Sequence, residues 1–124
     1  MVLVAKYLPG DRSPDYTSPW AGANWLSVAT DNGRQEEWDA VTFHKFQQLS
    51  KSTPEAGLTR MDIRVIFDSP PEKANVLSNH TGKIWYEELV GGLHHIPKDE
   101  LPEGAHFGFT LSTFMVNVQA YIPW

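Results

Sequence analysis

The stretch Met61-Asp62-Ile63-Arg64-Val65-Ile66-Phe67 alternates in the way that a β-strand requires. Met61, Ile63, Val65 and Phe67 share one side, and Asp62 and Arg64 take the other. The run stops at Ser69-Pro70-Pro71, which is turn chemistry. A second stretch, from Phe107 to Ser112, repeats the alternation. We therefore predict two strands, each with one face in the core.

Between residues 34 and 49 the apolar spacing changes to that of a helix. Asn32 followed by Gln35 is typical of an N-cap with its capping-box partner, so we predict a helix from about Arg34 to Leu49. The predicted core face of this helix consists of Trp38, Val41, Phe46 and Leu49.

The two ends of the chain also carry apolar segments. Val2 to Ala5 is continuously apolar, which is typical of a strand buried on both faces, and we expect its partners to come from a segment missing before it. Asn117 to Trp124 predicts the approach to a helix beginning near Pro123, beyond the end of the chain. A piece around Ile84 to Leu89 fits either a strand or a helix.

Composition narrows the possible functions. The 124 residues carry a net charge of −5, with 41% hydrophobic and 20% charged residues, which is ordinary globular composition. The absence of a Lys/Arg run argues against a nucleic acid or an anionic membrane as partner. The chain has no cysteine and no signal-peptide pattern, so we expect an intracellular, soluble protein without thiolate chemistry.

No self-contained catalytic set can be recognised. The adjacent His94 and His95 would point to opposite faces of a strand, so we expect hydrogen-bonded or exposed histidines and no metal site. The acidic pairs Glu36-Glu37 and Glu87-Glu88 are sequence neighbours, which seldom acquire the separate environments that acid–base catalysis needs.

One loop combines small residues, hydroxyls, an amide and two indoles: Thr17-Ser18-Pro19-Trp20-Ala21-Gly22-Ala23-Asn24-Trp25. Small residues let a backbone approach a ligand closely, and the polar groups can then bind it. The residues alone equally fit a tight loop packed on Trp20 and Trp25.

The loop resembles the Ser-Pro-Trp-Ala-Gly-Ala-Asn-Trp motif of fungal D-amino-acid oxidases, to which D-aspartate oxidases are closely related. Three further blocks resemble the family in the same order: residues 4–11, then Arg34-Gln35 with Trp38 and Thr42-Phe43, and finally residues 121–124. The family's Gly-x-Gly-x-x-Gly unit and its C-terminal half, which carries the substrate-binding residues, have no counterpart here. The resemblance thus implies an internal fragment.

The resemblance implies an α+β chain in which residues 1–57 form part of an FAD-binding, Rossmann-like region and residues 58–124 begin a mixed or antiparallel substrate-domain sheet. It places Lys6 and Tyr7 near the adenosine of FAD. It places the remaining cofactor contacts along the pyrophosphate, ribityl chain and isoalloxazine, at Thr17, Ser18, Gly22, Ala23 and Asn24.

The implied activity is FAD-dependent oxidation of a D-amino acid to a 2-oxo acid, releasing hydrogen peroxide and ammonia. The implied setting is a cytoplasmic or peroxisomal flavoprotein, with a homodimer possible. The alternative is a non-catalytic remnant domain that binds a nucleotide or a protein.

Overall fold

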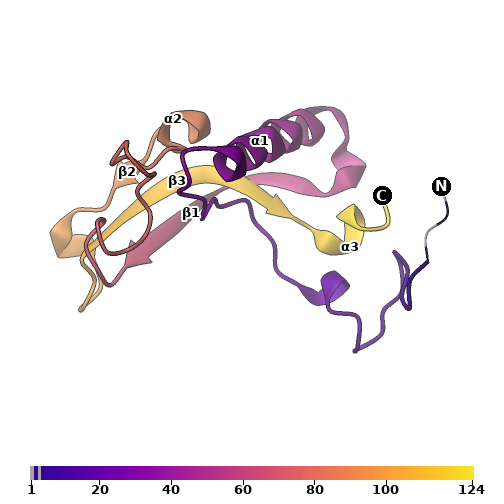
Figure 1. Cartoon of the computed structure of the whole chain (residues 1–124). Helices are drawn as coiled ribbons and strands as arrows, with labels where there is room; N and C mark the ends of the chain where they lie inside the picture. The colour runs from indigo at the N-terminus through magenta and orange to yellow at the C-terminus, as the bar shows by residue number, and fades with distance from the viewer. Residues whose placement is uncertain (1, 3) are drawn as a thin grey trace.

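The computed structural model describes residue 2 and residues 4–124 of the chain. Within them a short antiparallel sheet is combined with helices, which confirms the α+β class (Figure 1). The α-helices are α1 (Arg34–Ser52), α2 (Glu87–Val90) and α3 (Val118–Tyr121), and the strands are β1 (Leu58–Phe67), β2 (His94–His95) and β3 (Phe107–Val116). Single 3₁₀ turns occupy η1 (Ser18–Trp20), η2 (Pro54–Ala56) and η3 (Lys98–Glu100).

The two predicted strands are confirmed, and they are neighbours. β1 pairs antiparallel with β3 in an unbroken register from Leu58 opposite Val116 to Phe67 opposite Phe107. The strand order is β1-β3-β2, because β2 pairs with the other edge of β3. Both strands extend further than the alternation predicted, since each added residue gains a ladder partner on the opposite strand.

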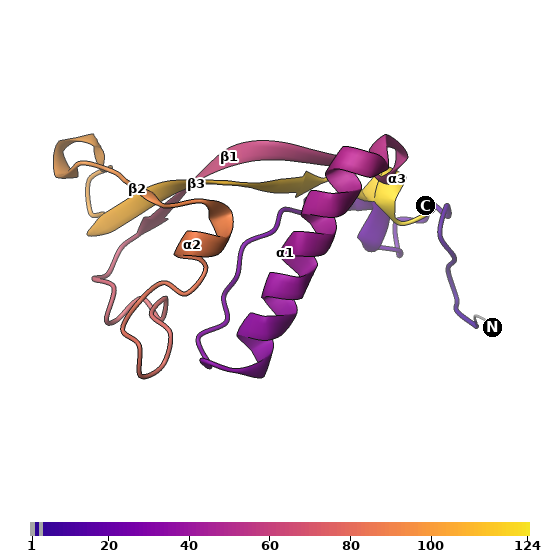
Figure 2. The ribbon, with the colours of Figure 1, turned by 90° about the horizontal axis from the view of Figure 1, so that it is seen from above.

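The core forms where α1 crosses the long strand pair (Figure 2). The ring of Phe43 on α1 lies 5.3 Å from the ring of Phe114 on β3 and 4.8 Å from that of Trp25, both in edge-to-face geometry. Tyr86 adds a third edge-to-face contact with Trp25 at 5.9 Å. A second cluster of Leu49, Ala56 and Leu58 closes the turn between α1 and β1.

The predicted core face of α1 is wrong for Trp38 and Val41. These side chains are 56% and 67% exposed, whereas Phe43, which the helical spacing did not single out, is 1% exposed. The helix is oriented by the fit of Phe43 and Leu49 against the sheet layer, and this turns Trp38 outward. There the guanidinium of Arg34 covers the Trp38 ring at 4.6 Å.

The start of α1 is confirmed at Arg34, but the predicted N-cap at Asn32 is wrong, because the N-cap position is Gly33, which has no side chain to accept a hydrogen bond. The Asp31 carboxylate, rather than the Asn32 side chain, accepts hydrogen bonds from the Gln35 and Glu36 backbone amides at 3.0 and 3.2 Å. In return, Glu36 Oε1 accepts a hydrogen bond from the backbone amide of Asn32 at 3.0 Å. The reciprocal pair thus joins the Asp31 segment to Glu36, because a carboxylate is the stronger acceptor.

The expectation for the N-terminal segment needs correction. Val2 and Val4 lie in an irregular segment and are 88% and 90% exposed, so the predicted buried strand is wrong for these residues, while Met1 and Leu3 lie outside the described part. The helix predicted to begin near Pro123 lies beyond the last residue and stays a prediction. A short helix, α3, forms before Pro123, and the Asn117 side chain caps it by accepting from the Gln119 backbone amide at 3.2 Å. The ambiguous piece near Ile84 contains the short helix α2.

Candidate functional site

The loop from Thr17 to Trp25 runs along the surface and then enters the sheet. Pro19 is its buried anchor in η1, and it lines a small cavity of about 50 Å³ together with Val118 and Ile122 of the α3 region. Pro19 is the second residue of η1, and its ring fixes the backbone φ angle within this turn. The η1 part of the loop therefore packs against α3.

Backbone pairing fixes the far end of the loop. Asn24 lies directly opposite Met115 in an isolated antiparallel bridge. The Trp25 amide donates to the Phe114 carbonyl at 2.8 Å, and the Val116 amide donates to the Ala23 carbonyl at 2.9 Å. Residues 23–25 thus act as a short additional strand on β3, and their position follows that of the sheet.

A polar network behind the loop was not foreseen from the sequence. Trp25 Nε1 donates to the Asp39 carbonyl at 3.1 Å, and Ser27 Oγ donates to Asp39 Oδ2 at 2.7 Å. Trp85 Nε1 donates both to Ser27 Oγ at 3.2 Å and to the Ala29 carbonyl at 3.0 Å. The partners lie up to 58 residues apart, so only the indole donors, which need partners when buried, could have signalled such a network.

The predicted contact residues of the loop share one property, which is accessibility. Thr17, Ser18, Gly22 and Asn24 are exposed and Ala23 is half-buried. Among residues 2 and 4–124, no hydrogen bond involves the hydroxyl of Thr17, the hydroxyl of Ser18 or the side-chain amide of Asn24. A Cβ built on Gly22 would meet no atom within 4 Å. The loop therefore offers free hydrogen-bonding groups beside open space.

Lys6, which is exposed, and Tyr7, which is half-buried, form a separate cluster that reaches the start of this loop. The Lys6 ammonium lies 4.9 Å from the Tyr7 ring, and that ring stacks on Tyr16 at 5.6 Å. Tyr7 Oη also donates to Asp15 Oδ2 at 3.2 Å. Because Tyr16 precedes Thr17, the Tyr7–Tyr16 stack brings Lys6 and Tyr7 close to the first residue of the loop.

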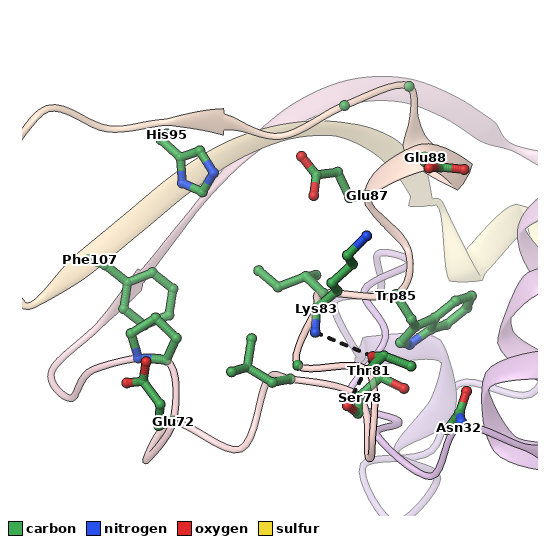
Figure 3. Close-up of a pocket in the computed structure, with 16 residues that line it drawn as sticks. Asn32, Glu72, Ser78, Thr81, Lys83, Trp85, Glu87, Glu88, His95 and Phe107 are labelled. Carbon is green, nitrogen blue, oxygen red and sulfur yellow. Dashed lines mark hydrogen bonds between the residues drawn. The ribbon is translucent and has the colours of Figure 1, made fainter.

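A wide hollow lies elsewhere, between the segment of residues 71–92 and the β2–β3 end of the sheet (Figure 3). It has a volume of about 1190 Å³ and is open to solvent, with Glu72, Lys83, Glu87, His95 and Phe107 among the residues of its wall. None of the predicted cofactor contacts lines it. In its wall, Ser78 Oγ is buried without a hydrogen-bond partner among the described residues.

His94 and His95 are both exposed on β2. Over the described residues, no group of three or more His, Cys, Asp and Glu side chains is placed to hold a metal ion. None of the helices in the same part of the chain combines the length and apolarity needed to cross a membrane.

Known proteins resemble this chain along almost its full length. A D-amino-acid oxidase of Schizosaccharomyces pombe is 36% identical over 122 residues, covering 98% of this chain and 33% of the relative. A D-amino-acid oxidase of Fusarium vanettenii is 27% identical, covering 100% of the chain and 35% of the relative. A D-aspartate oxidase of Talaromyces thermophilus is 32% identical, covering 90% and 30%. No protein-family model matches the chain.

The chain thus spans about a third of the length of the curated relatives that it matches. The compared region covers 90% or more of the chain in each comparison. The resemblance to the fungal D-amino-acid oxidase family is therefore confirmed: homologues named D-amino-acid oxidase and D-aspartate oxidase cover this chain almost from end to end.

Proposed function

We propose that this chain contributes the flavin-holding part of an FAD-dependent oxidase that converts D-amino acids to 2-oxo acids, releasing hydrogen peroxide and ammonia. The observation that carries the proposal is the accessible loop from Thr17 to Asn24, in a chain whose relatives are named as oxidases of D-amino acids and D-aspartate. Because the chain spans a third of those relatives, the substrate-binding groups of the whole enzyme are expected from outside it.

The residues of the loop fit the group that they would hold. The hydroxyls of Thr17 and Ser18 and the amide of Asn24 are accessible donors and acceptors for the phosphate, ribityl and ring oxygens of FAD. The open space at Gly22, next to the small Ala23, lets the backbone come within contact distance of a planar ring. Lys6 and Tyr7 would supply a charge and an aromatic face to the adenosine end.

When bound, FAD would accept the hydride that leaves the Cα of the substrate. The proposed role of this chain is to hold and orient the cofactor. The ladder at Ala23 and Trp25 fixes the loop backbone to β3, and the indole of Trp25 is fixed in turn by the Asp39 carbonyl. A loop held in this way keeps its hydrogen-bonding groups in place before the cofactor arrives, which reduces the entropic cost of binding.

We also propose the division of the chain that the resemblance implies. Residues 1–57 would belong to the FAD-binding region and residues 58–124 to the substrate-domain sheet. A cytoplasmic or peroxisomal setting is part of the same proposal.

The test is a titration of the purified chain with FAD, followed by flavin fluorescence and the visible spectrum. Asn24→Ala removes one candidate contact, and Asn79→Ala is the matched control because Asn79 is an equally exposed asparagine outside the loop. We expect Asn24→Ala and Gly22→Val to weaken binding about tenfold each, corresponding to roughly 1.4 kcal/mol, and Asn79→Ala to leave it unchanged.

Unfolding midpoints of the three variants show whether the loop substitutions act on binding alone. Equal FAD affinity in all variants would contradict the assignment of the loop. Peroxide release with D-alanine and D-aspartate, measured in the same samples, tests whether the chain turns over substrate by itself.

A further inference from the structure

Asn32 and Gly33 lie directly before helix α1, on the surface of the molecule. Asn32 is exposed, and it lies at the edge of the wide hollow (Figure 3). Gly33 follows it as the N-cap residue of α1. We propose that this pair is a site of spontaneous covalent modification, at which Asn32 loses ammonia and becomes a mixture of aspartate and isoaspartate while the chain stays folded.

The reaction uses only the chain itself and water. The backbone nitrogen of Gly33 gives up its proton and forms a bond to Cγ of Asn32, and the side-chain amide leaves with a proton as ammonia. One water molecule then opens the resulting cyclic imide at either of its carbonyls. Opening at Cγ gives aspartate. Opening at the backbone carbonyl gives isoaspartate, in which the main chain runs through the former side chain.

Both reacting groups are free in the structure. Gly33 has no side chain to shield its nitrogen, and the three atoms nearest to a Cβ built on it all belong to Asp31. Among residues 2 and 4–124, the Gly33 nitrogen donates to no backbone carbonyl and the Asn32 side chain forms no hydrogen bond. Both residues line a hollow of about 290 Å³ that is open to solvent, so water can reach the imide.

The groups on either side of the pair are fixed by the start of α1. The Asn32 backbone amide donates to Glu36 Oε1 at 3.0 Å, and the Gly33 carbonyl accepts from the Glu37 amide at 3.0 Å. These bonds hold the two ends of the dipeptide and leave the side chain of Asn32 and the nitrogen of Gly33 between them unbound. The pair is thus both ordered and accessible.

The charges near the pair oppose each other. A Cβ at Gly33 would lie 3.3 Å from Asp31 Oδ2, so this carboxylate disfavours negative charge on the Gly33 nitrogen. The positive end of the dipole of the 19-residue helix α1 favours the same charge. Because the two effects work against each other, the missing side chain at residue 33 decides how readily the attack occurs.

The chain contains a matched comparison for this effect. Asn75 has a φ of +50°, almost the same as the +49° of Asn32, and it is exposed as well. Its successor is Val76, which is branched at Cβ and 8% exposed, so bulk and packing shield the nitrogen that would attack. Since backbone φ and exposure agree, the comparison between the two sites isolates the successor residue.

The remaining three asparagines each lack one condition. Asn24 is followed by Trp25, whose amide is already bonded within the sheet. The side chain of Asn117 already accepts a hydrogen bond in the cap of α3. Asn79 is followed by His80, whose side chain stands beside the nitrogen. Asn32 is therefore the asparagine at which modification should concentrate.

Conversion changes the start of α1. It adds one negative charge to a chain whose net charge is −5, beside the carboxylates of Asp31 and Glu36. Isoaspartate also lengthens the main chain by one carbon between Asp31 and Gly33. The reciprocal hydrogen bonds between the Asp31 segment and Glu36 depend on that spacing, so the isoaspartate form should unfold more easily than the original chain.

Incubation of the whole chain in a mildly alkaline buffer, followed by tryptic mapping with mass spectrometry, tests the proposal. Trypsin cleaves after Arg12 and Arg34, which places Asn32 and Asn75 in different peptides. Heavy-oxygen water during incubation labels the carboxylates that form before digestion, and electron-transfer fragmentation separates isoaspartate from aspartate. We expect conversion of Asn32 to be about tenfold faster than that of Asn75, or faster still.

Two variants keep the backbone and change the chemistry. Asn32→Gly removes the side-chain amide but tolerates the positive φ, so it should fold normally and show no conversion at residue 32. Gly33→Ala adds a methyl group at an extended φ of −167°, which alanine adopts freely. We expect it to slow conversion of Asn32 about tenfold. Unfolding midpoints verify that both variants are folded.

Equal conversion of Asn32 and Asn75, or a Gly33→Ala variant that reacts as fast as the original chain, would overturn the proposal. So would conversion of Asn32 that occurs only after urea unfolds the chain. The converted protein, separated by ion exchange, is also compared with Asn32→Asp, which carries the same charge on an unaltered main chain. We expect the converted protein to melt lower, and equal melting would overturn the assignment of isoaspartate.

Discussion

The backbone amide of Trp25 donates a 2.8 Å hydrogen bond to the carbonyl of Phe114, so the end of the candidate cofactor loop is attached to the centre of the sheet. The side chains of the same two residues meet through Phe43, whose ring contacts both. Trp25 is 5% exposed, whereas Asn24 beside it is open to solvent. The boundary between core and candidate site thus falls between two consecutive residues.

Trp25→Phe should destabilise the fold by about 1 to 2 kcal/mol, because it removes the Nε1 donor and leaves the partly buried Asp39 carbonyl without that partner. Trp20→Phe is the matched control. Trp20 Nε1 also donates to a backbone carbonyl, that of Ser13 at 3.1 Å, but Trp20 is 53% exposed and water can replace the bond. Urea unfolding measures the free energy of unfolding of both variants. Equal losses of stability would show that the Trp25 hydrogen bond has no special role.

Asp31 should make the stability of α1 depend on pH. The backbone amide of Gln35, and after it that of Glu36, holds the pKa of Asp31 below its ordinary value of 3.8, against a smaller opposing effect of desolvation. A carboxyl with a lowered folded-state pKa stabilises the fold above its unfolded pKa and loses this effect as the pH falls through the folded pKa. Asp31→Asn should therefore flatten the acid side of the stability profile below about pH 4.

Thermal melts from pH 2 to 7 give that profile, and helix content by circular dichroism shows whether α1 is affected. Asp11→Asn is the control, because Asp11 is exposed and caps only the Leu8 amide in the N-terminal loop. An identical acid profile for wild type and Asp31→Asn would contradict the role of Asp31.

Tyr86 should make the stability of the fold depend on pH in the alkaline range. Its burial raises the pKa of the phenol to about 12 from 10.0. The unfolded chain ionises Tyr86 first as the pH rises, so the fold loses stability from about pH 10 until the folded group also ionises near 12. Absorbance titration should show a tyrosine phase near pH 12, and Tyr86→Phe should remove that phase. A titration curve that Tyr86→Phe leaves unchanged would contradict the prediction.

The sequence predicted those parts of the fold that depend on local pattern. The alternation in Met61–Phe67 and in Phe107–Ser112 identified both long strands, and the helix starting at Arg34 was placed correctly. Trp38 and Val41 were assigned to the core because helical spacing alone does not reveal which of two apolar faces meets the sheet. Phe43 occupies the core face of α1 because its ring contacts those of Trp25 and Phe114, both distant in sequence.

The same limit applies to the candidate site. The composition of residues 17–25 singled out the loop, but its attachment to β3 depends on pairing across about 90 residues, which no local pattern encodes. The apolar run at Val2 to Ala5 satisfied the pattern of a buried strand, yet Val2 and Val4 have no sheet neighbour in the described structure. An apolar sequence pattern indicates that a segment can form a strand, but the segment becomes a strand only when its backbone pairs with a neighbouring one.

Gly57 is the position where backbone conformation and close packing coincide. Its φ of +68° favours glycine, and a Cβ at Gly57 would lie only 2.8 Å from Cβ of Ala120 on α3. Gly82 has nearly the same φ, +65°, but open space around it. Gly82→Ala should therefore cost only the conformational strain of about 1 kcal/mol, whereas Gly57→Ala should cost about 2 to 4 kcal/mol because α3 must also move.

The difference between the two substitutions, measured by urea unfolding, isolates the packing of α3 on the turn before β1. The Gly57 carbonyl also accepts from the Asn117 amide at 2.8 Å, so a shift here would reach the cap of α3 and the adjoining Pro19 of the candidate loop. Gly57→Ala should accordingly weaken FAD binding as well as stability, while Gly82→Ala should leave FAD binding unchanged. Equal effects of the two variants on stability would mean that α3 does not pack on Gly57 in solution.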